Sequence, residues 1–442
     1  MGFRQISSEA STCKSVYPLA LINKKLVLMK IAVLSDFHFG YAYNSELEAD
    51  SFDNAAEAME RAVEGGADLV LIAGDIFDSR YPKTPVWTQA MRILAKPLLS
   101  DGNGTNLVSC TKELKRITKH TLSHLPVVSL HGNHEFRGND SNTLEALENA
   151  GLLVHLHKDT IVFEKDGTRV AVHGMSWVPD RYAKRELDEW NPRPVEGCVN
   201  ILLLHQSIAP YIFSPLDAPS LTSKNLPKGF DIIFDGHLHR PGSDSVDGVP
   251  LMFTGSTVIT QFEKGEAGAD KGYYEIELAA GERPKISFKP IMNGRKFFFE
   301  DVAIAGGLRA NVESKLNGIL ADGFAKKPLV KLKISGKESE YVPQDIKEIE
   351  RAYGERAVLR FVNDLESPEM AEKSELLRSM REEGMPVEEK GLRLLHDNLQ
   401  EMNFSSSFDT HAVFDLLVEG RVDNAFDILT GQQSTLSSLL KK

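Results

Sequence analysis

Five short apolar segments of this chain each run directly into Asp, Asn or His. The segment "VVSLHGNHE" carries residues 127–130 into Asn133 and His134, and "KIAVLS" is followed by Asp36 and His38. Ligands of α/β sheets gather at the carboxyl ends of the strands, so we expect these side chains to meet. A lone His after a strand is usually structural. Five endings of one chemical type instead predict one shared site.

The candidate ligands combine carboxylate, amide and imidazole groups without a thiolate, a donor set that favours Mn, Fe or Zn. Residues two apart on an extended chain project to the same side, so Asp36 and His38 can bind one ion. Seven donors are too many for one tetrahedral ion. They suit two ions about 3.5–4 Å apart if one carboxylate, most naturally Asp75, bridges them. The seven candidates are Asp36, His38, Asp75, Asn133, His205, His237 and His239.

Glycines stand beside several of these ligands, at Gly74, Gly132 and Gly236. Glycine tolerates backbone conformations closed to other residues. We therefore predict tight bends there that let the ligands turn inward together.

The order of elements predicts an α/β fold, because short β-rich runs alternate with helical stretches from Met29 to about residue 280. A helix is expected in "DSFDNAAEAMERAVEGGA", because Phe52, Ala55, Ala56, Met59 and Val63 recur at helical spacing, with Gly65 as the stop. Residues 97–124 look like an insertion with a basic helix in "KELKRITKH". The expected strands are "KIAVLS", "ADLVLIA", "LPVVSL", "RVAVHG", "VNILLL", "FDIIF" and "PLMFTG".

With 442 residues, the chain predicts more than one domain. Residues 1–28 are expected to be a poorly ordered extension, with Met29 as an alternative start and a strand in "KKLVLMK" left open. Residues 29–284 form the main α/β domain. Residues 285–365 read as a small α+β domain, and residues 366–442 as a helical, charged segment. An apolar stripe in that segment, which includes Phe414, either packs on its own protein or docks on a partner.

Composition limits the function. The net charge of −12 argues against generic nucleic-acid binding, although bound cations would supply local positive charge to a nucleic-acid enzyme. No apolar run approaches the roughly 20 residues that span a membrane. The chain has three cysteines, Cys13, Cys110 and Cys198, and no two of them are spaced as Cys-x-x-Cys. Neither disulfides nor a thiolate zinc site is therefore indicated. A reducing, cytoplasmic compartment is expected.

These motifs, in this order, resemble the calcineurin-like metallophosphoesterase superfamily: Asp-x-His, Gly-Asp-x-x-Asp, Gly-Asn-His-Glu, a lone His and Gly-His-x-His. The resemblance implies a double β-sandwich flanked by helices and phosphoester hydrolysis by a two-metal mechanism. It implies that His134 is a general acid or charge stabiliser rather than a ligand. The implied ligand sets are Asp36, His38, Asp75 and His239 for one ion, and Asp75, Asn133, His205 and His237 for the other.

Glu135 raises the alternative of a protein phosphatase, since those members of the superfamily also carry Gly-Asn-His-Glu. They place an Arg before that motif and an Asp-Arg-Gly in the second motif, so that paired guanidiniums grip a phosphate monoester. This chain has His131 before Gly132, and Asp78-Ser79-Arg80 in the second motif. The phosphatase reading is therefore weakened.

Closer still, the chain resembles the double-strand-break repair nucleases of the Mre-eleven or SbcD type, through "SDFHFGY", "IAGDIFDSRYP", "LLLHQS", "DGHLHR", "FTGST" and "DKGYYEIEL". The resemblance implies a homodimeric, nucleoid-associated DNA nuclease with two Mn²⁺ ions. Double-strand 3′ to 5′ exonuclease and single-strand endonuclease activities are implied. The domain at 285–365 would cap the DNA, and the C-terminal helices would dock on a coiled-coil ABC-type ATPase of the Rad-fifty or SbcC type.

Several roles stay open. A small-molecule phosphodiesterase or nucleotidase would share every metal ligand but would not need the helical tail. A non-catalytic scaffold is disfavoured because all seven ligands and His134 are present. The role of Asp78 is undecided. The other histidines near the motifs are expected to be structural: His131, His155, His157 and His173.

Overall fold

The computed structural model describes residues 27–136, 142–211, 220–279 and 281–366, with isolated positions between 392 and 428. The expectations for residues 1–26, and most of those for 366–442, lie outside the described residues. Chain contacts divide the protein into two units, which we describe separately. The first unit comprises Met1–Phe299, Asp322–Lys331 and Gly354–Arg360, and the second comprises the remaining segments.

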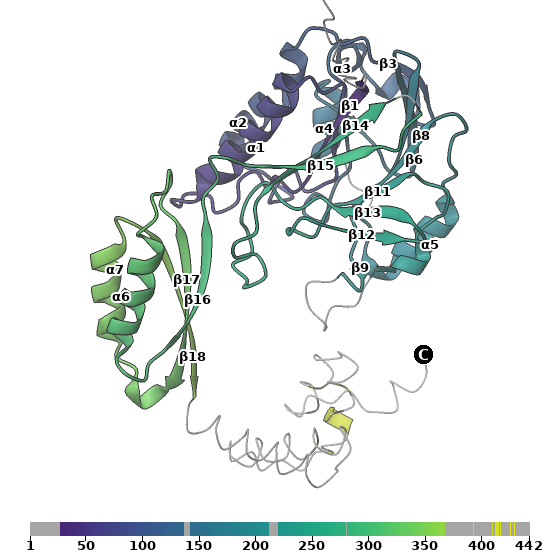
Figure 1. The fold of residues 1–442 in the computed structure, drawn as a ribbon. Coiled ribbons are helices and arrows are strands. Elements are labelled where there is room, and N and C mark those ends of the chain that lie inside the picture. The colour runs from purple at the N-terminus through teal and green to yellow at the C-terminus, as the bar shows by residue number, and fades with distance from the viewer. Residues whose placement is uncertain are drawn as a thin grey trace, which may run out of the picture. The chain divides into compact units, whose positions relative to one another are not determined.

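Two β-sheets form the centre of the first unit (Figure 1). The six-stranded sheet has the order β15-β14-β1-β2-β4-β5 and the seven-stranded sheet the order β12-β13-β11-β8-β7-β6-β3. The first sheet contains β1 (Val27–Leu34), β2 (Leu69–Ile72), β4 (Val127–Ser129), β5 (Val154–His155), β14 (Gly272–Ala279) and β15 (Lys285–Pro290). The second contains β3 (Asn106–Cys110), β6 (Asp159–Lys165), β7 (Thr168–Met175), β8 (Val199–Leu204), β11 (Ile232–Asp235), β12 (Gly242–Val246) and β13 (Val249–Phe253).

The alternation of side chains along β1 shows how the sheets are packed. Ile31 and Val33 join a buried cluster that also holds Val172 of β7 and Ile201 of β8, so the inner faces of the two sheets pack on one another. Ala32 and Leu34 point into a second cluster with helices α1 (Glu48–Glu64), α2 (Thr84–Leu94) and α4 (Thr143–Asn149). A third cluster joins the outer face of the seven-stranded sheet to α5 (Asp180–Trp190). The predicted double β-sandwich flanked by helices is confirmed.

All seven expected strands of the first unit are present. The open question about "KKLVLMK" is answered in part, because β1 starts at Val27 and pairs there with Ala279. Helix α1 ends at Glu64, with Gly65 as its C-cap, as expected.

The predicted basic helix is wrong. "KELKRITKH" forms only a turn at Leu114–Arg116 and a four-residue helix, α3 (Lys119–Leu122). Leu114 is 60% exposed and leaves Ile117 as the one buried apolar side chain of the segment, which is too little apolar face to stabilise a longer helix. The preceding segment instead adds β3 to the edge of the seven-stranded sheet.

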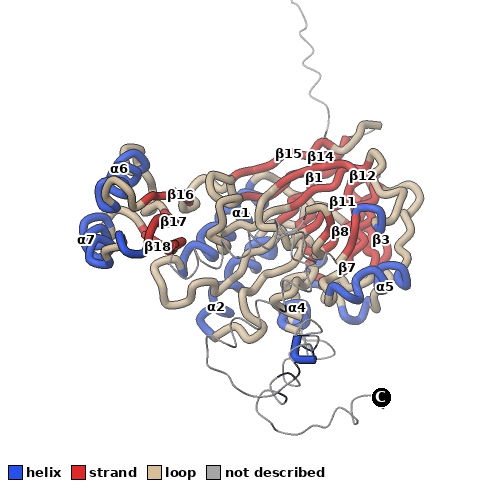
Figure 2. The backbone as a smooth tube through the Cα atoms, turned by 90° about the horizontal axis from the view of Figure 1, so that it is seen from below, coloured by secondary structure: helices blue, strands red, loops and turns tan. Residues whose placement is uncertain are grey.

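A smaller three-stranded sheet, β16-β17-β18, follows the sandwich along the chain. Its strands are β16 (Phe297–Ala303), β17 (Leu329–Lys337) and β18 (Val358–Glu366), with helices α6 (Leu308–Ile319) and α7 (Pro343–Tyr353) between them. Both helices lie on the same side of this sheet (Figure 1), and Figure 2 shows the same grouping from below. Within the described parts of the chain, no helix is both long and apolar enough to cross a membrane.

Candidate metal centre

The ends of five parallel strands deliver the predicted ligands. Strands β1, β2 and β4 are adjacent and parallel in one sheet, as β8 and β11 are in the other. Each carries an Asp, Asn or His within a few residues of its carboxyl end. The two sheet ends meet where the ring of His205 hydrogen-bonds through Nδ1 to the carbonyl of Ala73 at 2.6 Å.

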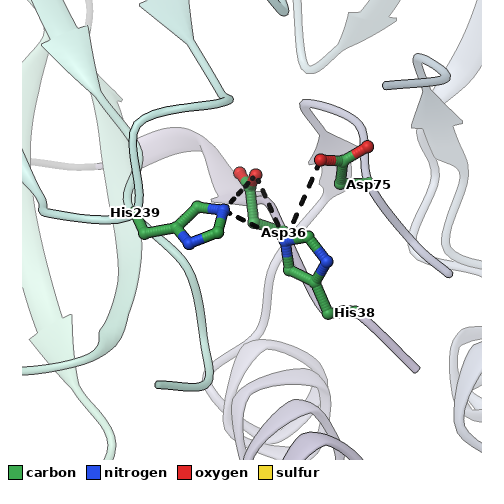
Figure 3. Close-up of side chains that lie close together, drawn as sticks. All are labelled: Asp36, His38, Asp75 and His239. Atoms are coloured by element: carbon green, nitrogen blue, oxygen red, sulfur yellow. Dashed lines mark hydrogen bonds and ion pairs between the residues drawn. The ribbon is translucent and has the colours of Figure 1, made fainter. Parts of the chain in front are cut away.

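Four of the seven candidates form one compact group, shown in Figure 3. Single ligand atoms of Asp36, His38, Asp75 and His239 all lie within 4.8 Å of one another, and all four residues are buried. His38 Nε2 and His239 Nε2 are 3.1 Å apart. They lie 3.8 Å and 3.5 Å, respectively, from Asp36 Oδ1.

The other three candidates gather on the far side of Asp75. His205 Nε2 lies 3.4 Å from Asp75 Oδ2, and 3.4 Å from Asn133 Oδ1. His237 Nδ1 lies 3.2 Å from the same Asn133 oxygen. Asp75 thus contacts both His38 and His205, which is the place a bridging carboxylate would occupy. All seven predicted ligands are brought together.

The donor set suits cations in two further respects. Asp36 Oδ1 is buried without a hydrogen-bond partner although two ring nitrogens point toward it, a costly arrangement that a cation would relieve. In addition, three of the histidine rings form a hydrogen bond through Nδ1 on the side away from the centre, so that Nε2 of each ring faces the centre. His38 is bonded to Asp78, His205 to Ala73 and His239 to Thr260. Histidines that bind metals usually show this backing contact.

The electrostatics also reflect crowded ligands. Burial raises the pKa of Asp36 to about 6. Burial alone would lower the pKa of His205, but its charge interaction and hydrogen bond with Asp75 raise it to about 10. Burial lowers the pKa of His237 to about 3. A divalent cation bound by these groups would displace the protons they carry, since metal ligands must be deprotonated.

The loops that hold the ligands have unusual backbones. Asp36, His38, Asp75 and His237 all have positive φ, which is uncommon outside glycine and often marks functional sites. Only Gly74 of the three predicted glycine bends has positive φ, at 102°. Gly132 and Gly236 serve a different purpose: a Cβ at Gly132 would overlap Asp75 Oδ1, and one at Gly236 would overlap the carbonyl of Ala73.

His134 lies at the edge of this centre, with its side chain 34% exposed and its ring edge-on to His38 at 4.7 Å between centroids. Its backbone N–H donates to Asp75 Oδ1 at 3.0 Å. Its Nδ1 bonds the carbonyl of Asp78 at 2.8 Å. A carbonyl only accepts, so Nδ1 carries the proton and Nε2 is the nitrogen left for proton exchange.

Asp78 connects His134 to a candidate ligand, a role the sequence left undecided. Its Oδ1 lies 3.2 Å from His38 Nδ1 and 3.8 Å from His134 Nδ1. The spacing in Gly-Asp-x-x-Asp was the available signal. Thr260, bonded to His239 Nδ1 at 2.7 Å, was not predicted from sequence at all.

Glu135 does not face a substrate. Its side chain is fully buried and accepts the backbone N–H of Phe77 at 2.6 Å and that of Gly132 at 2.8 Å. Burial raises its pKa to about 8. Glu135 therefore fastens the loop after β4 to the loop after β2.

Four further histidines near the motifs make contacts of their own. His131 Nδ1 and His155 Nε2 are 2.9 Å apart, and the ring of His157 lies 5.4 Å from that of His131. His173 bonds Asn200 and Thr160 from β7. A structural role for these four side chains stays a prediction.

The chain is similar to several known proteins. Residues 29–241 match the family model described as calcineurin-like phosphoesterase. The "Double-strand break repair protein MRE11" of Encephalitozoon cuniculi is 28% identical over 327 residues, covering 70% of this chain and 55% of that protein. The "DNA double-strand break repair protein Mre11" of Methanopyrus kandleri is 27% identical over 62% of this chain and 60% of its own length.

A third relative extends the match. The "DNA double-strand break repair protein Mre11" of Archaeoglobus fulgidus is 26% identical over 372 residues, covering 78% of both chains. Against the first two, the chain spans a little over half of the relative's length. The resemblance to calcineurin-like metallophosphoesterases and to Mre11-type nucleases is confirmed.

Proposed function

We infer that this chain, whose residues 29–241 match the calcineurin-like phosphoesterase family, is a Mn²⁺-dependent DNA nuclease of a double-strand-break repair complex. The observation that carries the proposal is the convergence of seven Asp, Asn and His side chains from two sheets, with His134 beside them. Five of the seven are buried, and Asn133 and His237 are partly buried. Anionic and imidazole ligands for divalent ions, together with a separate proton donor, suit phosphodiester hydrolysis.

We assign one ion to Asp36, His38, Asp75 and His239. The other is assigned to Asp75, Asn133, His205 and His237. When bound, two divalent ions would neutralise the phosphate oxygens and lower the pKa of water to supply a nucleophile. Mixed oxygen and imidazole donors without sulfur support Mn²⁺.

The chain's own residues supply orientation and a proton. Hydrogen bonds to the Nδ1 atoms of His38, His205 and His239 fix which nitrogen each ring offers to the centre. Asn133 Oδ1 lies between the rings of His205 and His237. His134, with Nδ1 held by the Asp78 carbonyl, presents Nε2 for protonating the leaving oxygen of the cleaved strand.

Similarity outside the catalytic motifs favours DNA over a small phosphodiester. The match to the Archaeoglobus fulgidus protein covers 372 residues, more than the 29–241 segment contains. We propose that residues 285–365 form a DNA-binding cap. We further propose a homodimer whose residues 366–442 dock on a coiled-coil ABC-type ATPase. Double-strand 3′ to 5′ exonuclease and single-strand endonuclease activities, in a cytoplasmic, nucleoid-associated setting, complete the proposal.

End-labelled duplex DNA tests the chemistry. The purified protein should release nucleotides from the 3′ end with Mn²⁺ and lose this activity with chelator. Asp75→Ala removes the carboxylate that contacts both ligand groups, and it should also be inactive. Inactivity on DNA together with turnover of a simple phosphodiester would favour a small-molecule phosphodiesterase or nucleotidase.

Removal of residues 366–442 tests the partner. The shortened chain is expected to retain Mn²⁺-dependent phosphodiester hydrolysis but to lose binding to the ATPase in a pull-down with the purified partner. Unchanged binding would place the docking surface elsewhere.

A further inference from the structure

The candidate ligand His239 is held by a buried polar network from residues that follow the segment matched by the family model. Lys271 and Glu266 form an ion pair in which each side chain is only 5% exposed. Lys271 Nζ also donates to the carbonyl of His239 at 2.8 Å and to Ser256 Oγ at 2.9 Å. The three ammonium protons thus have three acceptors.

A second contact holds the ring of the same residue. Thr260 Oγ1 lies 2.7 Å from His239 Nδ1. The backbone carbonyl of Thr260 accepts from the Tyr41 hydroxyl at 3.0 Å. Ser256 N–H donates to the carbonyl of His239 at 3.1 Å. His239 is therefore fixed both at its backbone and at its ring, and only Nε2 is directed to the centre (Figure 3).

Burying a charged pair is costly, and in some proteins such a pair is retained because it fixes one arrangement of its neighbours. Two of the three hydrogen bonds that Lys271 donates go to the carbonyl of His239 and to Ser256, and Ser256 itself hydrogen-bonds to His239. We propose that Lys271 and Glu266, with Ser256 and Thr260, are positioning residues that set the affinity of the centre for the ion held by His239. This inference rests on the proposed function, because it takes His239 as a ligand.

The chain supplies a matched control. Lys112 and Glu148 form another buried pair, with side chains 10% and 6% exposed, and Lys112 Nζ donates to the carbonyl of a histidine, His155, at 2.6 Å. His155 is not a candidate ligand. A purely structural role for Lys271 would therefore make Lys271→Met and Lys112→Met behave alike.

Thr260 allows a gentler test, because Thr260→Val keeps the shape and removes the hydroxyl, whereas Thr260→Ser keeps the hydroxyl. Mn²⁺ alone would be titrated calorimetrically into the metal-free, full-length protein, and thermal unfolding of the metal-free variants would be recorded alongside. Wild type should bind two ions. Thr260→Val and Lys271→Met should bind one of the two about 10–100-fold more weakly. Thr260→Ser and Lys112→Met should keep both affinities.

Equal Mn²⁺ affinity in wild type and Thr260→Val would overturn the inference, as would equal losses in the two lysine variants. If Lys271→Met fails to fold, the Thr260 pair decides. A wild-type protein that binds no Mn²⁺ would instead contradict the proposed function itself, so the two failures are distinguishable.

Discussion

His38 connects the proposed metal centre to the proposed proton donor. Its Nε2 faces Asp36, Asp75 and His239, and its Nδ1 bonds Asp78 Oδ1 at 3.2 Å. Its ring meets that of His134 edge-on. Asp78 thus places a carboxylate near the side chains of both a candidate ligand and His134.

Replacing Asp78 with Asn should lower kcat for Mn²⁺-dependent DNA hydrolysis by about 10–100-fold. The amide oxygen can still accept from His38 Nδ1, but the negative charge beside His134 is lost. Steady-state kinetics with metal analysis would check this. Two bound ions should remain, and full activity would show that the Asp78 charge is dispensable.

His134→Ala should abolish turnover while both ions stay bound, because the side chain is not among the proposed ligands. Full activity in this variant would sink the proposed mechanism. Elemental analysis of the same preparation would separate loss of the acid from loss of metal.

Glu135→Gln should lower the free energy of unfolding by about 1–3 kcal/mol, because the amide nitrogen cannot accept one of the two backbone N–H groups that Glu135 now satisfies. Chemical denaturation of the metal-free protein would measure it. An unchanged stability would mean that Glu135 does not fasten the two loops.

The seven candidate ligands could be read from the sequence because each follows an apolar strand and has a distinctive chemical type. Thr260 could not be predicted, since threonine has many structural uses and this one lies 21 positions from His239. The buried role of Glu135 also needed the structure, because only the fold shows that the N–H of Phe77 lies beside its carboxylate.

At the scale of the elements, short glycine-containing loops set how closely the strand ends approach. A Cβ at Gly132 would overlap Asp75 Oδ1, so Gly132→Ala should displace the proposed bridging carboxylate and weaken Mn²⁺ binding by at least about 10-fold. Metal titration would check this.

Gly318 in α6 is the control, since a Cβ there meets nothing within 4 Å. Gly318→Ala should leave Mn²⁺ binding unchanged and stabilise the protein by about 0.5–1 kcal/mol. Equal affinities in both variants would contradict the close-approach explanation.

The buried strands were predictable because continuous apolar runs such as "VNILLL" need two covered faces. The exposed edge strand β3, with Val108 45% exposed, carries no such signal and was missed. The basic segment after it suggested a helix by composition, but Leu114 is exposed and Ile117 alone of its two apolar side chains is buried.

At the scale of the whole first unit, titratable groups contribute to the free energy of unfolding with opposite dependence on pH. Burial raises the pKa of Asp235 to about 8. The folded chain therefore keeps a proton on Asp235 that the unfolded chain has already lost, and the stability that this proton contributes is lost as pH rises through that value. Burial lowers the pKa of His157 to about 4, although the nearby charges of Asp159 and Glu186 oppose the shift. Between about pH 6.5 and 4 the unfolded chain therefore binds more protons at His157 than the folded chain does.

Stability contributed by a neutral His157 should be fully present above about pH 6.5 and lost as pH falls toward 4. His157→Gln removes this titration, so the variant should gain about 2–3 kcal/mol relative to wild type between pH 7 and pH 4. Urea unfolding of the metal-free proteins at both pH values would measure the difference. A constant difference would contradict the neutral state of His157.

The central claim is that two ions share Asp75 at the meeting point of the two sheets. Anomalous diffraction from crystals grown with Mn²⁺ tests it most directly. We predict two peaks about 3.5–4 Å apart. One peak should be bounded by Asp36, His38 and His239, the other by Asn133, His205 and His237, with Asp75 between them. A single peak, or two peaks that do not share Asp75, would contradict the account.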